Sequence, residues 1–135
     1  MIKAELSHQL MITVNNKVGT LAEITQVVAS SGINVVAVCA YAIDNQGFIN
    51  FVADNNKSAR KLLEDHGYNV REEEVVLLSL GNKPGALQSV CEKVAEAGID
   101  LVLIYGSVEQ GQKTSRIVLV SENIEEVLAV IRMMK

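Results

Sequence analysis

The chain has 135 residues, of which 49% are hydrophobic but only 4% aromatic, and its formal net charge at pH 7 is −4. This acidic balance argues against a nucleic-acid partner, whose phosphates attract a basic surface. There is neither a run of 18 apolar residues nor a basic segment ahead of an apolar core at the N-terminus, so we expect no membrane span, no signal peptide and a cytoplasmic location.

The first predicted strand covers residues 8–14, where apolar and polar side chains alternate. A polar turn at residues 15–17 follows it. Residues 19–31 then carry apolar side chains at helical spacing, which predicts an amphipathic helix with one face on a sheet. These apolar residues are Leu21, Ile24, Val27 and Val28. We expect Gly32 to end this helix.

A hairpin is predicted next, with strands at residues 33–42 and 48–53. The turn between them contains Gly47, which we expect to take a positive φ. Asparagine and aspartate at residues 54–56 then offer caps for a second helix that closes at Gly67, and a short fourth strand follows. The predicted order of this half is βαββαβ.

The second half repeats this order at a fixed offset. Asn16-Lys17-Val18-Gly19-Thr20-Leu21 returns as Asn82-Lys83-Pro84-Gly85-Ala86-Leu87, and the two glycines differ by 66 positions (85 − 19). We therefore predict two modules, at residues 1–71 and 72–135, whose strands join with almost no linker. Because the chain stops at Lys135, the second module lacks its last strand. Modules of about 65 residues are marginal alone, so we expect a homodimer or a larger oligomer.

The repeated strand–turn–helix element contains the groups that could bind a ligand. Amide groups at the start of a helix are unpaired and carry partial positive charge, so they suit a carboxylate, and a glycine in the turn permits close approach. The alternative is that Asn16 and Asn82 simply cap their helices. Each copy is followed thirteen residues after its glycine by a second match, Gly32-Ile33-Asn34 and Gly98-Ile99-Asp100, which favours a binding role.

These two motifs resemble those of the ACT domain family. The resemblance implies an α+β fold of two tandem ferredoxin-like βαββαβ modules with antiparallel sheets, and a regulatory protein that binds a free amino acid. It also implies a site between modules, where the first loop of one faces the start of the second strand of its neighbour. The ligand-binding residues carried over by position are Asn15, Asn16, Lys17, Val18, Gly19, Thr20, Leu21, Asn34, Val35, Val36, Asn82, Lys83, Pro84, Gly85, Ala86, Leu87, Asp100, Leu101 and Val102.

The chain departs from the family pattern in three places. Asn16 and Asn82 replace the usual loop aspartate, and Val18 stands where proline is common. The missing last strand leaves the edge of the second module either open or paired by another chain. The two pockets should differ, because one pairs loop 82–87 with Asn34 and the other pairs loop 16–21 with Asp100.

We therefore predict a non-enzymatic amino-acid sensor without metal, cofactor or catalytic residues. Cys39 and Cys91 belong to no metal-binding cluster and are interpreted as small hydrophobic residues. The alternative is a regulatory or structural subunit that docks on an amino-acid biosynthetic enzyme without binding a ligand itself. A small ferredoxin-like enzyme would need convergent acid and base groups, which the sequence does not offer.

Overall fold

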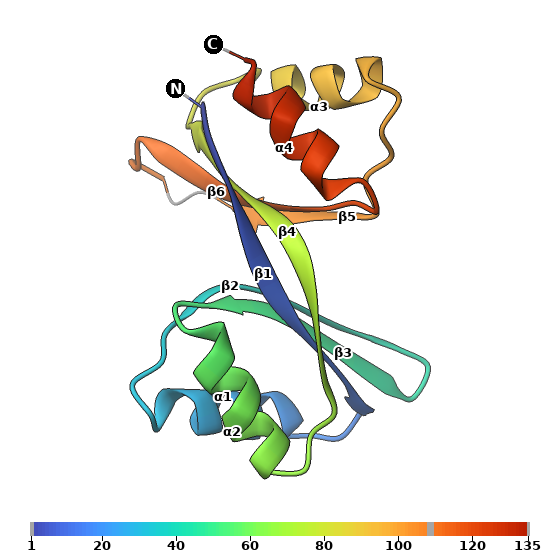
Figure 1. Ribbon diagram of the computed structural model, residues 1–135. Helices are drawn as coiled ribbons and strands as arrows, with labels where there is room; N and C mark the ends of the chain where they lie inside the picture. Colours follow the sequence, from blue (N-terminus) through green and yellow to red (C-terminus); the bar gives the residue numbers. More distant parts are fainter. Residues whose placement is uncertain (1, 108–109, 135) are drawn as a thin grey trace. The chain divides into compact units, whose positions relative to one another are not determined.

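The computed structural model describes residues 2–107 and 110–134, and its elements follow the predicted order (Figure 1). They are β1 (Ile2–Asn15), α1 (Thr20–Ala29), β2 (Val35–Ile43), β3 (Gln46–Ala53), α2 (Asn56–Asp65), β4 (Val70–Gly81), α3 (Ala86–Glu96), β5 (Leu103–Ser107), β6 (Thr114–Val120) and α4 (Ile124–Arg132). The fold is α+β, and each predicted helix and strand is present. The second strand begins at Val35 and not at residue 33, and the short fourth strand is continuous with the first strand of the second half in β4.

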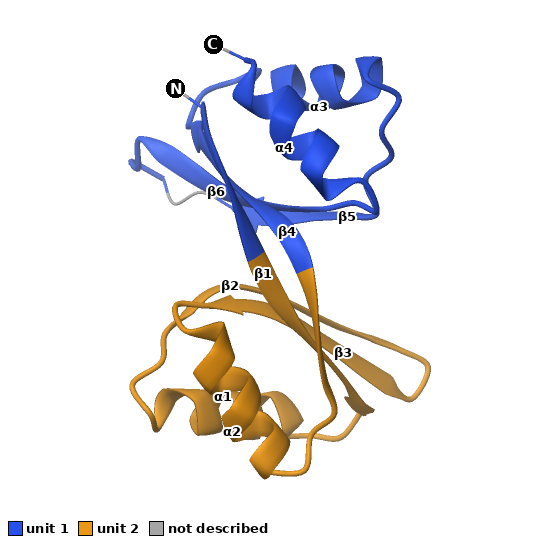
Figure 2. Ribbon diagram, viewed as in Figure 1, with its two compact units in different colours: residues 1–7, 74–135 blue, residues 8–73 orange. Residues whose placement is uncertain are grey.

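The chain forms two compact units (Figure 2). Unit 2 is His8–Glu73, and unit 1 joins Met1–Ser7 to Glu74–Lys135. Strands β1 and β4 each contribute to both units, because the change of unit falls within each strand. The units therefore do not follow the predicted modules, which were cut once, between residues 71 and 72.

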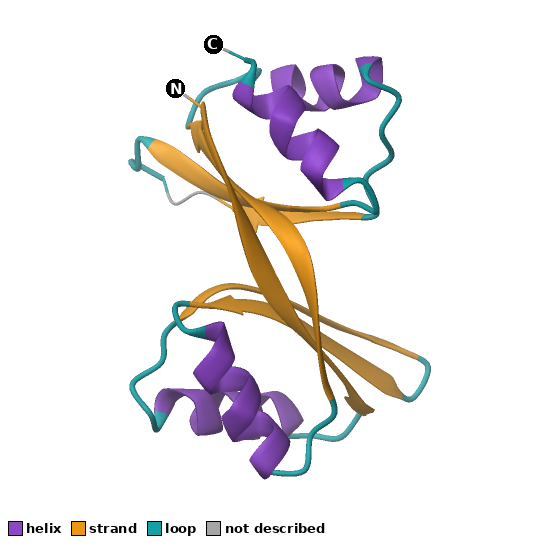
Figure 3. Cartoon of the chain, viewed as in Figure 1, coloured by secondary structure: helices purple, strands orange, loops and turns teal. Residues whose placement is uncertain are grey.

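Unit 2 has the strand order β2-β3-β1-β4, with α1 and α2 on one face of the strands (Figure 3). The ladders of β3 with β1 and with β2 are antiparallel. Phe51 of β3 lies opposite Leu10 of β1 and Val38 of β2. Because residues at every second position share a face, the helix-facing side chains of these strands meet α1 and α2 in one apolar core.

Unit 1 repeats the arrangement with the order β1-β4-β6-β5 and with α3 and α4 on one face of the strands. Leu119 of β6 takes the place of Phe51, since it lies opposite Val76 of β4 and Ile104 of β5. The buried core of this unit includes Leu78, Val90 and Ile131. Each unit thus has a hydrophobic core of its own.

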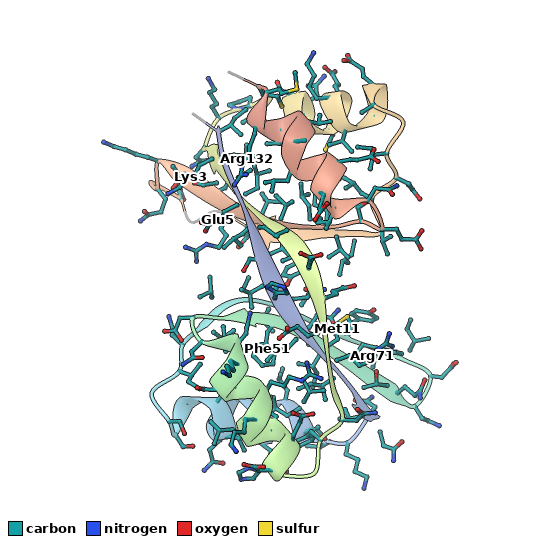
Figure 4. All side chains as sticks on the ribbon, in the orientation of Figure 1. Lys3, Glu5, Met11, Phe51, Arg71 and Arg132 are labelled. Carbon is teal, nitrogen blue, oxygen red and sulfur yellow. The ribbon has the colours of Figure 1, made fainter. Side chains whose placement is uncertain are left out.

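The N-terminal part of β1 completes unit 1. Ile2 and Ala4 pack against its core, and Arg132 Nε of α4 donates a hydrogen bond of 3.4 Å to the carbonyl oxygen of Ala4 (Figure 4). No strand follows α4 in the residues that the structure describes, as predicted. The expectation of an open edge, or of an edge paired by another chain, is wrong, because β1 begins at Ile2 and not at residue 8 and is a neighbour of β4.

The turn of the first hairpin also differs from the prediction. Its two residues are Asp44 and Asn45, and Asp44 takes the left-handed conformation with φ 55°. Gly47 lies in β3, where a Cβ atom would stand 3.3 Å from Val14 Cγ2. Gly47 therefore serves close packing against β1, and an aspartate, which tolerates this conformation better than most residues, turns the chain.

Candidate ligand-binding site

The turn between β1 and α1 is built on Gly19. This residue is the N-cap of α1 and has φ 90°, a conformation that glycine adopts without strain. The turn is held by two backbone hydrogen bonds, from Thr20 N to the oxygen of Lys17 at 3.3 Å and from Asn16 N to the oxygen of Asn45 at 2.8 Å. Asn16, Lys17 and Val18 are exposed at its surface.

The turn between β4 and α3 repeats this geometry around Gly85, with φ 87°. Ala86 N donates to the oxygen of Lys83 at 3.3 Å, and Asn82 N donates to the oxygen of Lys113 at 2.8 Å. Two additional bonds are made here, from Asn82 Nδ2 to the oxygen of Gln112 at 2.9 Å and from Lys83 N to the oxygen of Gly81 at 3.0 Å. The duplication therefore preserves the backbone of the turn to within a few degrees of φ.

Neither helix start is capped by a side chain. The alternative that Asn16 and Asn82 are caps is therefore wrong, since the glycines occupy the cap positions. In the described part of the chain, the amides of Leu21 and Ala22 make no hydrogen bond, and neither do those of Leu87 and Gln88. Such amides at a helix N-terminus can donate to a carboxylate, and the helix dipole favours the negative charge.

The starts of the second strands are anchored differently in the two units. In unit 2, Asn34 N donates to Asp54 Oδ1 at 3.1 Å, and Asp54 N donates back to the oxygen of Asn34 at 3.0 Å. In unit 1, the hydroxyl of Ser121 donates to the oxygen of Asp100 at 2.8 Å. In both units the backbone is fixed and the residue itself, Asn34 or Asp100, is exposed.

A cavity of about 330 Å³ lies in unit 2 between α1, β2 and β3. It brings together two of the predicted site residues, Leu21 from the loop and Val35 from the strand start. The other lining residues had not been predicted, because they follow from which side chains of β2 and β3 face α1. The full lining is Leu21, Ile24, Thr25, Val28, Val35, Val38, Ile49 and Phe51.

A second, polar cavity of about 410 Å³ lies in unit 1 on the face of the strands turned away from α3 and α4. Lys3 and Glu5 of β1 line it together with Arg116 of β6 (Lys3 and Glu5 are labelled in Figure 4). Sequence reasoning did not find it, because it started the first strand at residue 8. The alternation of Ile2, Ala4 and Leu6 with polar neighbours is the signal that shows residues 2–7 to be strand.

One titratable group near the start of α1 is clearly shifted. Burial, followed by the hydrogen bond and charge of Glu23, raises the pKa of Tyr68 to about 12. The hydroxyl of Tyr68 donates to Glu23 Oε1 at 2.6 Å, so it ties the first turn of α1 to the segment before β4. Among the described residues, no group of three or more His, Cys, Asp or Glu side chains could hold a metal ion.

The two predicted pockets each combine a loop from one unit with a strand start from the other, and they stay predictions. None of the helices in the described residues is long and apolar enough to cross a membrane.

Each unit thus has one helix, α1 or α3, that follows a glycine turn and has no side-chain cap. The family model described as "ACT domain pair" matches residues 6–135, and the chain therefore belongs to this family. This match confirms the resemblance drawn from the two motifs. Comparison with curated proteins finds no match.

Solved structures share the fold over nearly the whole chain. A protein from Bacteroides thetaiotaomicron is 28% identical with a TM-score of 0.88, covering 96% of this chain and 88% of that chain. The regulatory subunit of aspartate kinase from Thermus thermophilus is 16% identical with a TM-score of 0.70, covering 98% and 95%. That of Thermus flavus is 18% identical with a TM-score of 0.64, covering 97% and 94%. At these lower identities the likeness concerns the fold alone.

Proposed function

We propose that this ACT domain pair is a non-enzymatic regulatory protein that binds a free amino acid at its two glycine turns. The observation that carries the proposal is the repeated helix start, in which Gly19 and Gly85 leave two amides unbonded in each unit. These amides would take the carboxylate of the ligand. Asn34 or Asp100 would accept from its ammonium group, most strongly at Asp100, where the hydrogen bond is charge-assisted.

A thermal-shift screen against the twenty amino acids tests this function. An amino acid at 100 times its Kd should stabilise the protein by about 2.7 kcal/mol. The substitutions Gly19→Ala and Gly85→Ala should weaken that response, because they change the turn that presents the amides. Gly67→Ala is the matched control, since Gly67 has the same φ of 90° and the same open surroundings but ends α2. If no amino acid shifts the transition, the ligand-binding proposal fails.

The two sites should not be equivalent. Pro84 stiffens the loop of unit 1, so less entropy is lost when a ligand orders it. We expect Asp100→Ala and Asn34→Ala to weaken binding at different sites, and titration calorimetry on both variants measures this. If neither variant changes a binding isotherm, the ligand lies elsewhere in the protein.

The second candidate function is a subunit that docks on an amino-acid biosynthetic enzyme and binds no ligand itself. The exposed apolar side chains on the outermost strands favour docking of some kind: Val38 and Ile43 of β2 are 51% and 58% exposed, and Ile104 of β5 is 40% exposed. The same side chains favour a homodimer, which sedimentation at micromolar concentration would test. If sedimentation shows a monomer and no amino acid shifts the thermal transition, docking on an enzyme is the better supported function.

A further inference from the structure

The cavity of unit 2 has a lining that discriminates between ligands. Seven of its eight lining residues are apolar, and none carries a charge. The exception is Thr25, whose hydroxyl lies 2.9 Å from the oxygen of Leu21 and 3.0 Å from that of Ala22. The Thr25 hydroxyl donates its proton within α1. Thr25 therefore presents to the cavity a methyl group and a hydroxyl oxygen that can only accept a hydrogen bond. A charged side chain placed here would lose its hydration without gaining a partner.

The cavity lies next to the segments proposed to hold an amino acid. Leu21, in the first turn of α1, is two residues from Gly19 and carries one of the unbonded amides. Val35, on the opposite wall, is the other predicted site residue that lines the cavity. A ligand whose carboxylate rests on the start of α1 therefore has the apolar wall of the cavity within reach of its side chain.

The cavity also has a suitable size. An engineered apolar cavity of roughly 150 Å³ holds a benzene molecule. A cavity of about 330 Å³ that opens to the surface has room for a side chain of three or four carbons. Exposure of Val38 at 51% and Leu21 at 43% shows that solvent still covers part of the lining, which a ligand could cover instead.

We infer that the amino acid bound at the turn of Gly19 has an aliphatic side chain, as in leucine, isoleucine or valine, and that this side chain occupies the cavity between α1, β2 and β3. The inference rests on the proposed function and names its ligand class. A methylene group in an apolar pocket changes affinity by about 10-fold to 200-fold, so leucine should bind at least about tenfold more tightly than alanine. Lysine, aspartate and threonine should bind more weakly than leucine.

Titration calorimetry of the whole protein with leucine, isoleucine, valine, alanine, lysine, aspartate and threonine tests this inference. The variant Val38→Asp places a carboxylate in the cavity at an exposed position that tolerates it, and it should weaken leucine binding at least about tenfold. Ile43→Asp is the matched control, because Ile43 is an exposed apolar residue of the same strand outside the cavity. It should leave the affinity within about twofold. Circular dichroism checks that both variants fold.

Three results would overturn the inference, and they can be told apart. Tighter binding of lysine, aspartate or threonine than of leucine would leave the proposed function standing but refute the aliphatic class. Equal effects of Val38→Asp and Ile43→Asp would mean that the side chain does not enter this cavity. Binding of none of the amino acids would refute the proposed function together with the inference.

Discussion

Units 1 and 2 share a backbone and differ in how side chains support it. The two turns agree in the φ of their glycines, 90° and 87°, and in the lengths of two equivalent hydrogen bonds. The anchors of the following strand are a carboxylate in one unit and a hydroxyl in the other, Asp54 and Ser121. The glycine turn and the strand ladders therefore set the geometry, and the polar groups around them can be exchanged.

The largest expected effect concerns the strand segments that complete each unit. Val70 is 3% exposed in the core of unit 2, and Ala4, 66 positions earlier, packs less completely against the core of unit 1. Val70→Asp buries an unpaired charge and should lower the free energy of unfolding by about 4 kcal/mol or more. Ala4→Asp should lower it by about 1–3 kcal/mol.

The control for this pair is Lys3→Asp, which changes the exposed face of the same segment and should stay within about 0.5 kcal/mol. Urea unfolding followed by circular dichroism measures all three variants. Equal stability of the Ala4→Asp and Lys3→Asp variants would contradict the completion of unit 1 by the N-terminal segment.

A smaller effect tests whether the two cores are independent. Leu63 of α2 and Ile131 of α4 are almost fully buried, each in the core of its own unit. Leu63→Ala and Ile131→Ala should each lower the free energy of unfolding by about 2–5 kcal/mol, through lost contacts and a residual cavity. Because the residues belong to separate clusters, the double variant should equal the sum within about 0.5 kcal/mol. An interaction energy above 1 kcal/mol between the two substitutions would show that the two cores are not independent.

The N-cap residues of α2 and α4 should contribute unequally to the free energy of unfolding. Asn55 Oδ1 accepts from Ser58 N at 3.1 Å, so Asn55→Ala should lower the free energy of unfolding by about 1 kcal/mol. Asn123 occupies the same cap of α4 but makes no side-chain cap bond, and Asn123→Ala should lower it by only about 0.5 kcal/mol or less. Thermal and urea unfolding of the two variants measure the difference. Similar losses would mean that the bond of Asn55 adds nothing.

The smallest effect depends on pH and belongs to unit 2 alone. The pKa of Tyr68 is raised in the folded state. The contribution of Tyr68 to the free energy of unfolding is therefore complete below pH 10 and is lost as the pH rises toward 12. At pH 9, Tyr68→Phe should lower the free energy of unfolding by about 0.5 kcal/mol, since its bond to Glu23 is exposed. Urea unfolding at pH 9, 10 and 11 should show this difference shrinking. A constant difference would contradict the proton linkage.

Much of the fold could be predicted because the repeat fixes the register twice. Leu10, Ile12 and Val14 recur as Val76, Leu78 and Leu80, and all of them lie in the two cores except Val14, which is partly buried and packs against the core of unit 2. The prediction missed residues 2–7, although they alternate, because their partner strand is some 70 residues away in the chain. Alternation shows that a segment is a strand, but it cannot show which sheet the strand joins.

The candidate site could be predicted only in part. The glycine turns followed from the repeated motif, whereas their role as caps depends on backbone angles that the sequence does not contain. The cavity required the pairing of Val38 with Phe51, which places both side chains beneath α1. A shift of one residue in that ladder would have turned one of the two side chains away, so the lining follows from register rather than from composition.

The most direct test of amino-acid binding is a series of proton–nitrogen correlation spectra of the labelled protein, recorded as the twenty amino acids are added singly. The amide signals of Gly19 and Gly85 report on the proposed turns, while Gly67, which follows α2, and Gly106, in β5, lie outside these turns and serve as internal controls. We expect at least one amino acid to move Gly19 or Gly85 and to leave the controls in place. If every amino acid leaves both signals unmoved, or if the control glycines move equally, the proposed site is contradicted.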